Sequence, residues 1–348
     1  MRGFRDRDFL QTTEGLIFCV VGPLHPSKRV ISYLKYVPSE SGVWGKGGKR
    51  FSRILQGYTI PNLLETFTFL EQNYPLYLYH SPVNNITLTA VPHQNIEIHF
   101  IPERKLAQLR LASQLDHLQN RLIRFTSFLE KKSGVPCESF GVTGSLLLNI
   151  HQPAFSDLDV TVSGIKNSWT LRNSITEGSS SEKSIRRLAG KPLEAWCAKK
   201  TKQYPLKFAE ALKIYERKWN LGFFENTWCS IHPVKLKSEI TERYGQRTYY
   251  PCGQVTIYAI VSDNTDSLFL PAVYHVEEVE VLEGQKFGHV KEIVSYESLY
   301  DSLAENGEAI VAKGKLERVV ESETGREHYR VLVGSPEGKG NEYIKLQS

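Results

Sequence analysis

The sequence predicts a multidomain α+β protein with three parts. Residues 1–101 and 249–348 are rich in short β-branched and aromatic runs separated by turn residues, a pattern typical of strands. Residues 102–248 combine a long helical pattern with short apolar strands. We therefore expect a β-rich N-terminal domain, a central domain with helices and a mixed sheet, and a small C-terminal β-barrel.

Composition excludes several classes of protein. Charged residues make up 23% of the 348 residues, an ordinary value for a globular chain. No apolar run approaches the roughly 20 residues of a membrane span, so no membrane association is expected. The five cysteines are scattered at spacings that fit neither zinc nor a disulfide framework. These features predict a cytoplasmic protein.

The N-terminal part should consist mostly of strands. Alternating or buried apolar runs predict strands at residues 15–21, 30–37, 49–54 and 96–100. A single helix is expected at residues 61–73, where Leu63, Leu64, Phe67 and Leu70 share one side.

A long amphipathic helix is expected from Pro102 to about Lys132. Apolar residues recur there every three or four positions, and arginines occupy the opposite face. Pro102 suits the first position of a helix, and Gly134 suits its end.

The segment after this helix has the strongest functional pattern in the chain. An apolar strand at 140–142 leads to Gly144 and Ser145, and a second strand carries Asp157 and Asp159. Strand side chains alternate, so the two aspartates point the same way and form an oxygen site suited to Mg²⁺. Gly144 would let the backbone approach a ligand, and Ser145 offers a hydroxyl and N–H groups to a phosphate. The competing interpretation is that the aspartates only begin a strand near a turn.

This pattern resembles the DNA polymerase β-type nucleotidyltransferase superfamily, whose signature is a Gly-Ser turn, a spacer of about ten residues and an Asp-x-Asp strand. The resemblance covers residues 140–164. The N-terminal and C-terminal segments also look similar to an uncharacterised archaeal group of predicted nucleotidyltransferases.

The resemblance implies transfer of a nucleoside monophosphate from a nucleoside triphosphate to an acceptor hydroxyl, such as an RNA or DNA end. Mg²⁺ or Mn²⁺ held by Asp157 and Asp159 would activate the acceptor and stabilise the pyrophosphate leaving group. Gly144 and Ser145, together with Ser156, would bind the nucleotide.

A basic segment follows the aspartate strand. Residues 182–218 contain eleven Lys and Arg residues against four Glu, and the pattern there is helical. Arg186, Arg187, Lys199 and Lys200 are therefore candidates to neutralise a triphosphate or an acceptor backbone. The alternative is a pair of solvated helices with ordinary surface charge.

The next strand, at residues 228–235, should carry a third acidic residue in the superfamily but has Ser230 and His232 instead. His232 is a candidate metal ligand that would favour Mn²⁺ over Mg²⁺. It could equally be a packing or hydrogen-bonding histidine. Glu225 and Glu239, on either side of the strand, are alternative carboxylates. We expect two firm carboxylate ligands and a weak or absent third.

The C-terminal part should form a small β-barrel from strands near residues 255–261, 276–282, 309–312, 328–333 and 343–346, and an OB-like barrel fits this pattern. Residues 275–348 contain nine Lys and Arg against fifteen Asp and Glu, which argues against a nucleic-acid groove. A different class of function also fits the chain: a non-catalytic RNA- or nucleotide-binding protein on a decayed transferase scaffold.

Overall fold

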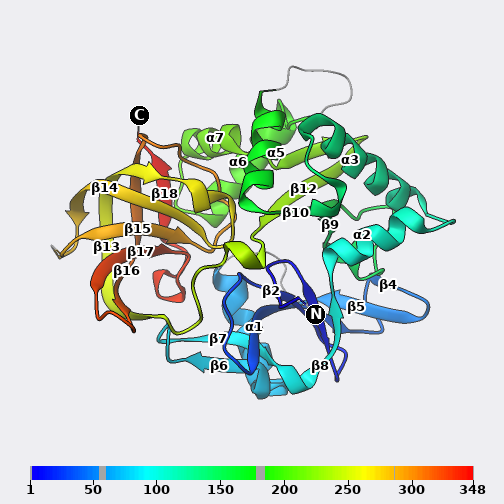
Figure 1. The fold of residues 1–348 in the computed structure, drawn as a ribbon, viewed down its shortest axis with the longest axis horizontal. Helices are drawn as coiled ribbons and strands as arrows, with labels where there is room; N and C mark the ends of the chain where they lie inside the picture. Colours follow the sequence, from blue (N-terminus) through cyan, green and yellow to red (C-terminus); the bar gives the residue numbers. More distant parts are fainter. Residues whose placement is uncertain (1, 55–59, 178–184, 286, 348) are drawn as a thin grey trace.

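The computed structural model describes residues 2–54, 60–177, 185–285 and 287–347, and within these ranges the chain forms three sheets and seven α-helices. The α+β class expected from the sequence is therefore confirmed. Figure 1 shows the N-terminal part (blue to cyan) below the central part (green), with the C-terminal part (yellow to red) beside both.

The N-terminal part is an eight-stranded antiparallel sheet, and the strands and helix expected from its sequence are confirmed. The sheet order is β4-β5-β3-β2-β1-β8, and β7 pairs with both β3 and β6. The helix is α1 (Ile60–Asn73). The strands are β1 (Phe9–Thr12), β2 (Ile17–Val20), β3 (Arg29–Pro38), β4 (Trp44–Lys46), β5 (Lys49–Arg53), β6 (Leu78–Ser81), β7 (Ile86–Pro92) and β8 (Ile96–Phe100).

The long helix expected from Pro102 to Lys132 is instead two helices, α2 (Pro102–Leu111) and α3 (His117–Ser133). The reason is local. The Asp116 carboxylate accepts hydrogen bonds from the Leu118 and Gln119 N–H groups, while the Gln119 side chain accepts from the Asp116 N–H. This capping box starts a new helix where the apolar repeat alone would continue the old one.

The central sheet has the order β11-β12-β10-β9, in which β10 and β12 are parallel and the other neighbours antiparallel. Leu158, Val160 and Val162 of β10 pack into a buried core with Leu122 and Phe125 of α3. One face of this sheet is therefore covered by helices. The elements are β9 (Phe140–Val142), α4 (Gly144–Leu147), β10 (Leu158–Ser163), α5 (Ile165–Thr176), β11 (Leu221–Phe224) and β12 (Thr227–Val234).

Helices α6 (Lys191–Gln203) and α7 (Phe208–Arg217) follow α5 in sequence but pack toward the C-terminal part. Tyr204 and Leu206, between the two helices, and Ile214 of α7 belong to the same hydrophobic core as the C-terminal strands. The helical pattern expected within the basic segment 182–218 is thus represented by α6 and α7.

The C-terminal sheet closes on itself. Its pairings run β13-β14-β15-β17-β16 and return to β13, with β15 and β17 parallel and β18 added beside β16. The strand β15 was not expected from the sequence. The strands are β13 (Arg247–Asp263), β14 (Ala272–Glu283), β15 (Val290–Ser295), β16 (Ala309–Glu321), β17 (Glu327–Val333) and β18 (Tyr343–Leu346).

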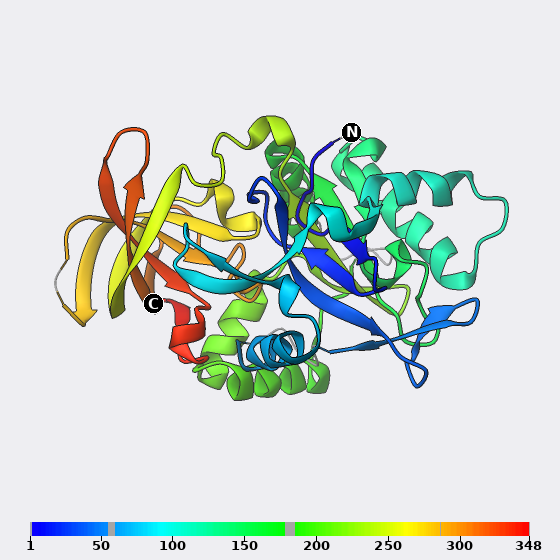
Figure 2. The ribbon, with the colours of Figure 1, turned by 90° about the horizontal axis from the view of Figure 1, so that it is seen from below.

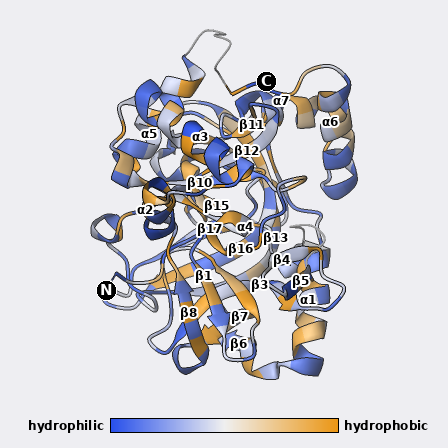
Figure 3. Cartoon of the chain, turned by 90° about the vertical axis from the view of Figure 1, so that its right-hand side faces the viewer, coloured by the Kyte–Doolittle hydropathy of each residue, from blue (hydrophilic) through white to orange (hydrophobic). Residues whose placement is uncertain are grey.

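Hydrophobic residues follow the strands of the sheets, and hydrophilic residues are prominent on helices such as α2, α3 and α6 (Figure 3). None of the helices in the described ranges is long and apolar enough to cross a membrane.

Candidate active site

Asp157 and Asp159 lie at the amino end of β10, on the face of the central sheet that the helices leave uncovered. Asp157 directly precedes the strand, and Asp159 is its second residue. Their neighbours Leu158 and Val160 point into the helix-covered core, so the two carboxylates point the other way. The N-terminal sheet lies across the central part on this side, as the view from below shows (Figure 2).

The two carboxylates differ in their ionisation. Burial, followed by the negative charge of Asp159, raises the pKa of Asp157 to about 6, although the positive charges of Arg53 and Lys35 act against the rise. Burial alone would also raise the pKa of Asp159, but hydrogen bonding and charge from His232, with Lys35 and Ser230, lower it to about 2. In this pair of carboxylates, Asp159 is held ionised, and Asp157 is harder to ionise than a free aspartate.

Gly144 forms the turn that faces these carboxylates. Its φ angle is +66°, a left-handed conformation that glycine adopts readily. A Cβ atom at this position would overlap Oδ2 of Asp159. The glycine is thus required both by the backbone conformation and by the close approach of the Asp159 side chain.

The residues on either side of the Gly144–Ser145 turn contact the N-terminal part of the chain. The Gly45 N–H donates to the Ile150 carbonyl at 3.0 Å, and the Thr143 hydroxyl donates to the Arg7 carbonyl at 2.8 Å. Ser145 is buried in the first turn of α4. Ser156 is buried as well, and its hydroxyl accepts a hydrogen bond from the Gln152 N–H at 2.9 Å, which ties the loop together.

Ser230 and His232 on β12 form a hydrogen-bonded chain with Asp159. Ser230 pairs with Asp159 across the parallel strands, and its hydroxyl donates to Oδ1 of Asp159 at 2.5 Å. The His232 Nε2 atom is 2.8 Å from the same hydroxyl oxygen. Because the single hydroxyl proton is directed at Asp159, Nε2 must be the donor in the second bond. Burial, followed by the charge of Arg7, lowers the pKa of His232, and Nε2 can donate this bond from either the neutral or the charged ring.

The carboxylates considered as a third acidic group lie elsewhere. Glu225 makes an ion pair with Arg124 at 2.6 Å, beside the β11–β12 turn. Glu239 accepts hydrogen bonds from the Ile165 and Leu236 N–H groups, beyond the opposite end of β10. Across the described residues, no three His, Cys, Asp or Glu side chains form a cluster that could hold a metal ion.

The two arginines of the basic segment are placed differently. Arg186 forms a bridge with Phe223 of β11, and the strand register puts it on the same sheet face as the aspartates. It lies three strand positions from β10, or roughly 14 Å at the usual strand spacing. Arg187 instead donates to the Tyr215 and Glu216 carbonyls at the end of α7.

The two lysines are both on α6. Lys199 is exposed to solvent. The Lys200 ammonium lies 5.5 Å and 5.4 Å from the ring centres of Trp196 and Tyr204, on the side of α6 that packs toward the barrel. Lys183, which also belongs to the basic segment, lies outside the described residues.

Sequence reasoning missed Lys35 of β3 and Arg53 of β5, which supply positive charge to the aspartates from the N-terminal sheet. Lys35 is buried, at 8% exposure. A lysine in an aromatic strand (Tyr33-Leu34-Lys35-Tyr36) is the signal that could have identified it, because buried lysines need an acidic or functional partner.

Comparison with known proteins finds an archaeal relative that aligns along nearly the whole chain. The chain is 30% identical over 346 residues to the uncharacterized protein MJ1086 of Methanocaldococcus jannaschii, and the alignment covers 99% of each chain. No protein-family model matches the sequence. No solved structure matches it significantly.

Proposed function

We propose that this chain, which belongs to the same family as protein MJ1086 of Methanocaldococcus jannaschii, is a metal-dependent nucleotidyltransferase. It would move a nucleoside monophosphate from a nucleoside triphosphate to an acceptor hydroxyl, and a nucleic-acid end is the acceptor that we favour. The observation that carries the proposal is the Asp157–Asp159 pair facing both the Gly144 turn and two cations, Lys35 and Arg53.

The carboxylates suit a divalent cation. Oxygen donors are the ligands that Mg²⁺ prefers. Burial and then the charge of Asp159 raise the pKa of Asp157, and a bound cation would offset both effects by favouring the ionised carboxylate. Bound Mg²⁺ or Mn²⁺ would neutralise the carboxylates and the triphosphate. His232 donates through Nε2 to Ser230, so we assign it the role of positioning Asp159 instead of binding the metal.

The chain's own groups would bind and orient the reactants. The backbone of the Gly144–Ser145 turn would hold phosphate oxygens, and Lys35 and Arg53 would supply fixed positive charge opposite the aspartates. In the reaction, the acceptor oxygen bonds to the α-phosphorus while the bond to the β-phosphate breaks. Pyrophosphate leaves, and the acceptor proton passes to solvent.

We extend the proposal to the domain layout. Residues 1–101 would form the β-rich domain, 102–248 the nucleotidyltransferase domain and 249–348 a barrel of the OB type, whose five strands close a ring. The acidic balance of residues 275–348 speaks against nucleic acid binding on this barrel.

A second candidate is a non-catalytic RNA- or nucleotide-binding protein on a decayed transferase scaffold. The observation that favours it is the serine at the position expected to supply the third acid, because Ser230 pairs directly with Asp159. Binding would need the phosphate turn and the cations but no complete metal site.

The test is a transfer assay. The full chain is incubated with each labelled nucleoside triphosphate, Mg²⁺ or Mn²⁺, and a panel of RNA and DNA ends. Asp157→Asn and Asp159→Asn should each abolish transfer, while Glu277→Gln, an exposed carboxylate of the barrel, should leave it unchanged. Nucleotide binding without transfer under every condition would establish the second candidate instead.

A further inference from the structure

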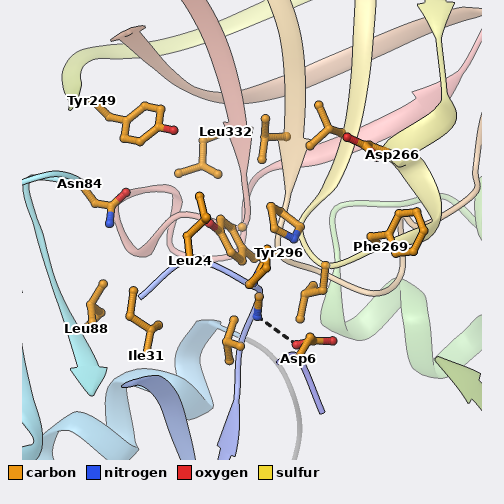
Figure 4. Close-up of a pocket in the computed structure, with 18 of the residues that line it drawn as sticks. Asp6, Leu24, Ile31, Asn84, Leu88, Tyr249, Asp266, Phe269, Tyr296 and Leu332 are labelled. Atoms are coloured by element: carbon orange, nitrogen blue, oxygen red, sulfur yellow. Dashed lines mark hydrogen bonds between the residues drawn. The ribbon is translucent and has the colours of Figure 1, made fainter. Parts of the chain in front are cut away.

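A cavity of about 520 Å³ lies where the N-terminal sheet, the segment after β12 and the barrel meet (Figure 4). This volume is in the range of small-molecule sites. Leu24, Ile31 and Leu88 line it from the N-terminal side, and Tyr249 and Leu332 line it from the barrel. The cavity has no part in the proposed transfer chemistry.

The barrel contributes the outer face of two paired strands. On β15 and β17, Ile293 and Val331 point into the barrel core, while Glu292 and Arg330 line the cavity. Tyr296, which directly follows β15, lines the cavity near its centre (Figure 4). One wall of the cavity is therefore the outside of a closed barrel, and the lining combines apolar and aromatic side chains with charged groups.

The charged groups are mostly acidic. Seven carboxylates and four cationic side chains line the cavity. All four cations already have acidic partners: Arg5 pairs with Glu103, Lys235 with Asp266, Arg247 with Glu242 and Glu292, and Arg330 with Glu317. A phosphate or carboxylate ligand would therefore meet a surplus of negative charge.

This pairing leaves three lining carboxylates over, of which Asp6 pairs with Arg7 and Glu239 accepts two backbone hydrogen bonds. Glu297 is the third. Its Oε2 atom is buried and has no hydrogen-bond partner among the described residues, and no cationic group in those residues approaches within ion-pair distance. Burial, followed by the charge of Glu342, raises the pKa of Glu297 to about 8. Burial likewise raises the pKa of Asp6 and of Glu242, which line the same cavity. Asp6 and Glu242 already have Arg7 and Arg247 as cationic partners, so Glu297 is the group that would gain most from an added cation.

We propose that this cavity binds a protonated organic amine with an apolar body. The ammonium group pairs with the surplus carboxylate at Glu297, and the body packs among the leucine and isoleucine side chains. Tyr296 adds an aromatic face that attracts a cation, whereas the rings of Tyr249 and Phe269 already contact Arg330 and Lys235. The inference does not rest on the proposed transferase activity.

The test uses three probes that share an indole body and differ in charge: tryptamine (cationic), tryptophol (neutral) and indole-3-acetate (anionic). Calorimetric titration of the full chain should show tryptamine binding at least about tenfold more tightly than tryptophol, because hydrogen bonds to charged groups contribute more than ~1.4 kcal/mol. Indole-3-acetate should bind most weakly. Glu297→Gln should reduce the affinity for tryptamine to that for tryptophol.

Two variants that fill the cavity, Leu88→Trp and Ile31→Phe, should each remove tryptamine binding, and either one suffices if the other does not fold. Glu277→Gln is the matched control for Glu297→Gln and should bind tryptamine as the wild type does, because Glu277 is exposed and does not line the cavity. Absence of tryptamine binding, equal affinity for the three probes, or binding that survives filling of the cavity would overturn the proposal.

Discussion

The Asp159 carboxylate occupies the space that a Cβ atom on Gly144 would fill. The Gly144 turn, which would bind phosphate, and the β10 strand, which would bind metal, are therefore already packed closely together without a ligand.

Replacing Gly144 with alanine should cost more stability than the same change at Gly134. Both glycines have left-handed φ angles, of +66° and +70°, so both variants incur the backbone strain of about 1 kcal/mol. Only Gly144→Ala also drives a methyl group into Asp159, whereas Gly134 has open space. Urea unfolding of the two variants measures the difference. Equal losses would show that the Asp159 side chain moves aside freely.

Lys35→Met should weaken nucleoside triphosphate binding by about tenfold or more while keeping the chain folded. A charge-assisted contact contributes roughly 1.5–3 kcal/mol, and Lys35 is one of the two cations that act on Asp157. Lys28→Met, on an exposed residue before β3, is the control. Calorimetric titration with a non-hydrolysable triphosphate should show weaker binding for Lys35→Met than for Lys28→Met. Identical affinities would remove Lys35 from the site.

Arg186→Ala and Arg187→Ala should change different properties: the first should weaken RNA binding, and the second should lower stability. Arg186 lies on the aspartate face, so its loss should reduce the log–log salt slope of RNA binding by about 0.7–0.9 with little loss of stability. Arg187 holds carbonyls at the end of α7, so its loss should lower the free energy of unfolding by roughly 1–2 kcal/mol and leave the slope unchanged. Fluorescence anisotropy across a salt series, with thermal melts, tests both. The reverse pattern would exchange their roles.

His232→Ala should lower the rate of transfer without changing the preference between Mg²⁺ and Mn²⁺. Its Nε2 atom donates to Ser230, so the variant loosens Asp159 but removes no metal ligand. Asp159→Ala should be more damaging, because it removes a ligand outright. Rates measured over a series of Mg²⁺ and Mn²⁺ concentrations distinguish the two. A selective loss of Mn²⁺ activity in His232→Ala would restore the histidine as a ligand.

Glu297→Gln should stabilise the chain most at mildly alkaline pH. The pKa of Glu297 is about 8 in the folded chain against an ordinary value of 4.5, so its contribution to stability is complete below about pH 4.5 and is lost as pH rises toward 8. Glutamine does not ionise and keeps that contribution. The gain over wild type should grow from near zero at pH 4.5 to on the order of 3 kcal/mol at pH 7.

Urea unfolding at several pH values measures the gain. Glu277→Gln, on an exposed part of the barrel, should follow the wild-type curve. A gain that does not depend on pH would mean that Glu297 is already ionised in the folded chain.

The elements around the candidate site were predictable because local patterns determine them. The β9 and β10 strands and the Gly144 turn follow from alternation and from glycine chemistry within about 25 residues. The break before α3 was missed because the Asp116 capping box interrupts a continuous apolar repeat.

The aromatic strand around Lys35 could have marked this lysine as unusual, but its pairing with the aspartates could not be predicted, and neither could that of Arg53. Both depend on the N-terminal sheet docking over a strand more than 100 residues later in the chain. The cavity beside Glu297 could not be predicted from the sequence for the same reason. Its walls come from three segments that only the tertiary fold brings together.

The packing of the Gly144 loop has a consequence for how the chain can be divided. Leu147, Leu148 and Ile150 share a buried core with Phe9 and Tyr36 of the N-terminal sheet. A fragment starting at Pro102 would leave these three apolar side chains in water and remove the partners of Thr143 and Ile150. The candidate catalytic motif is contiguous in sequence, but its folding depends on the N-terminal part. Any fusion that joins it to other domains would therefore have to include the first hundred residues.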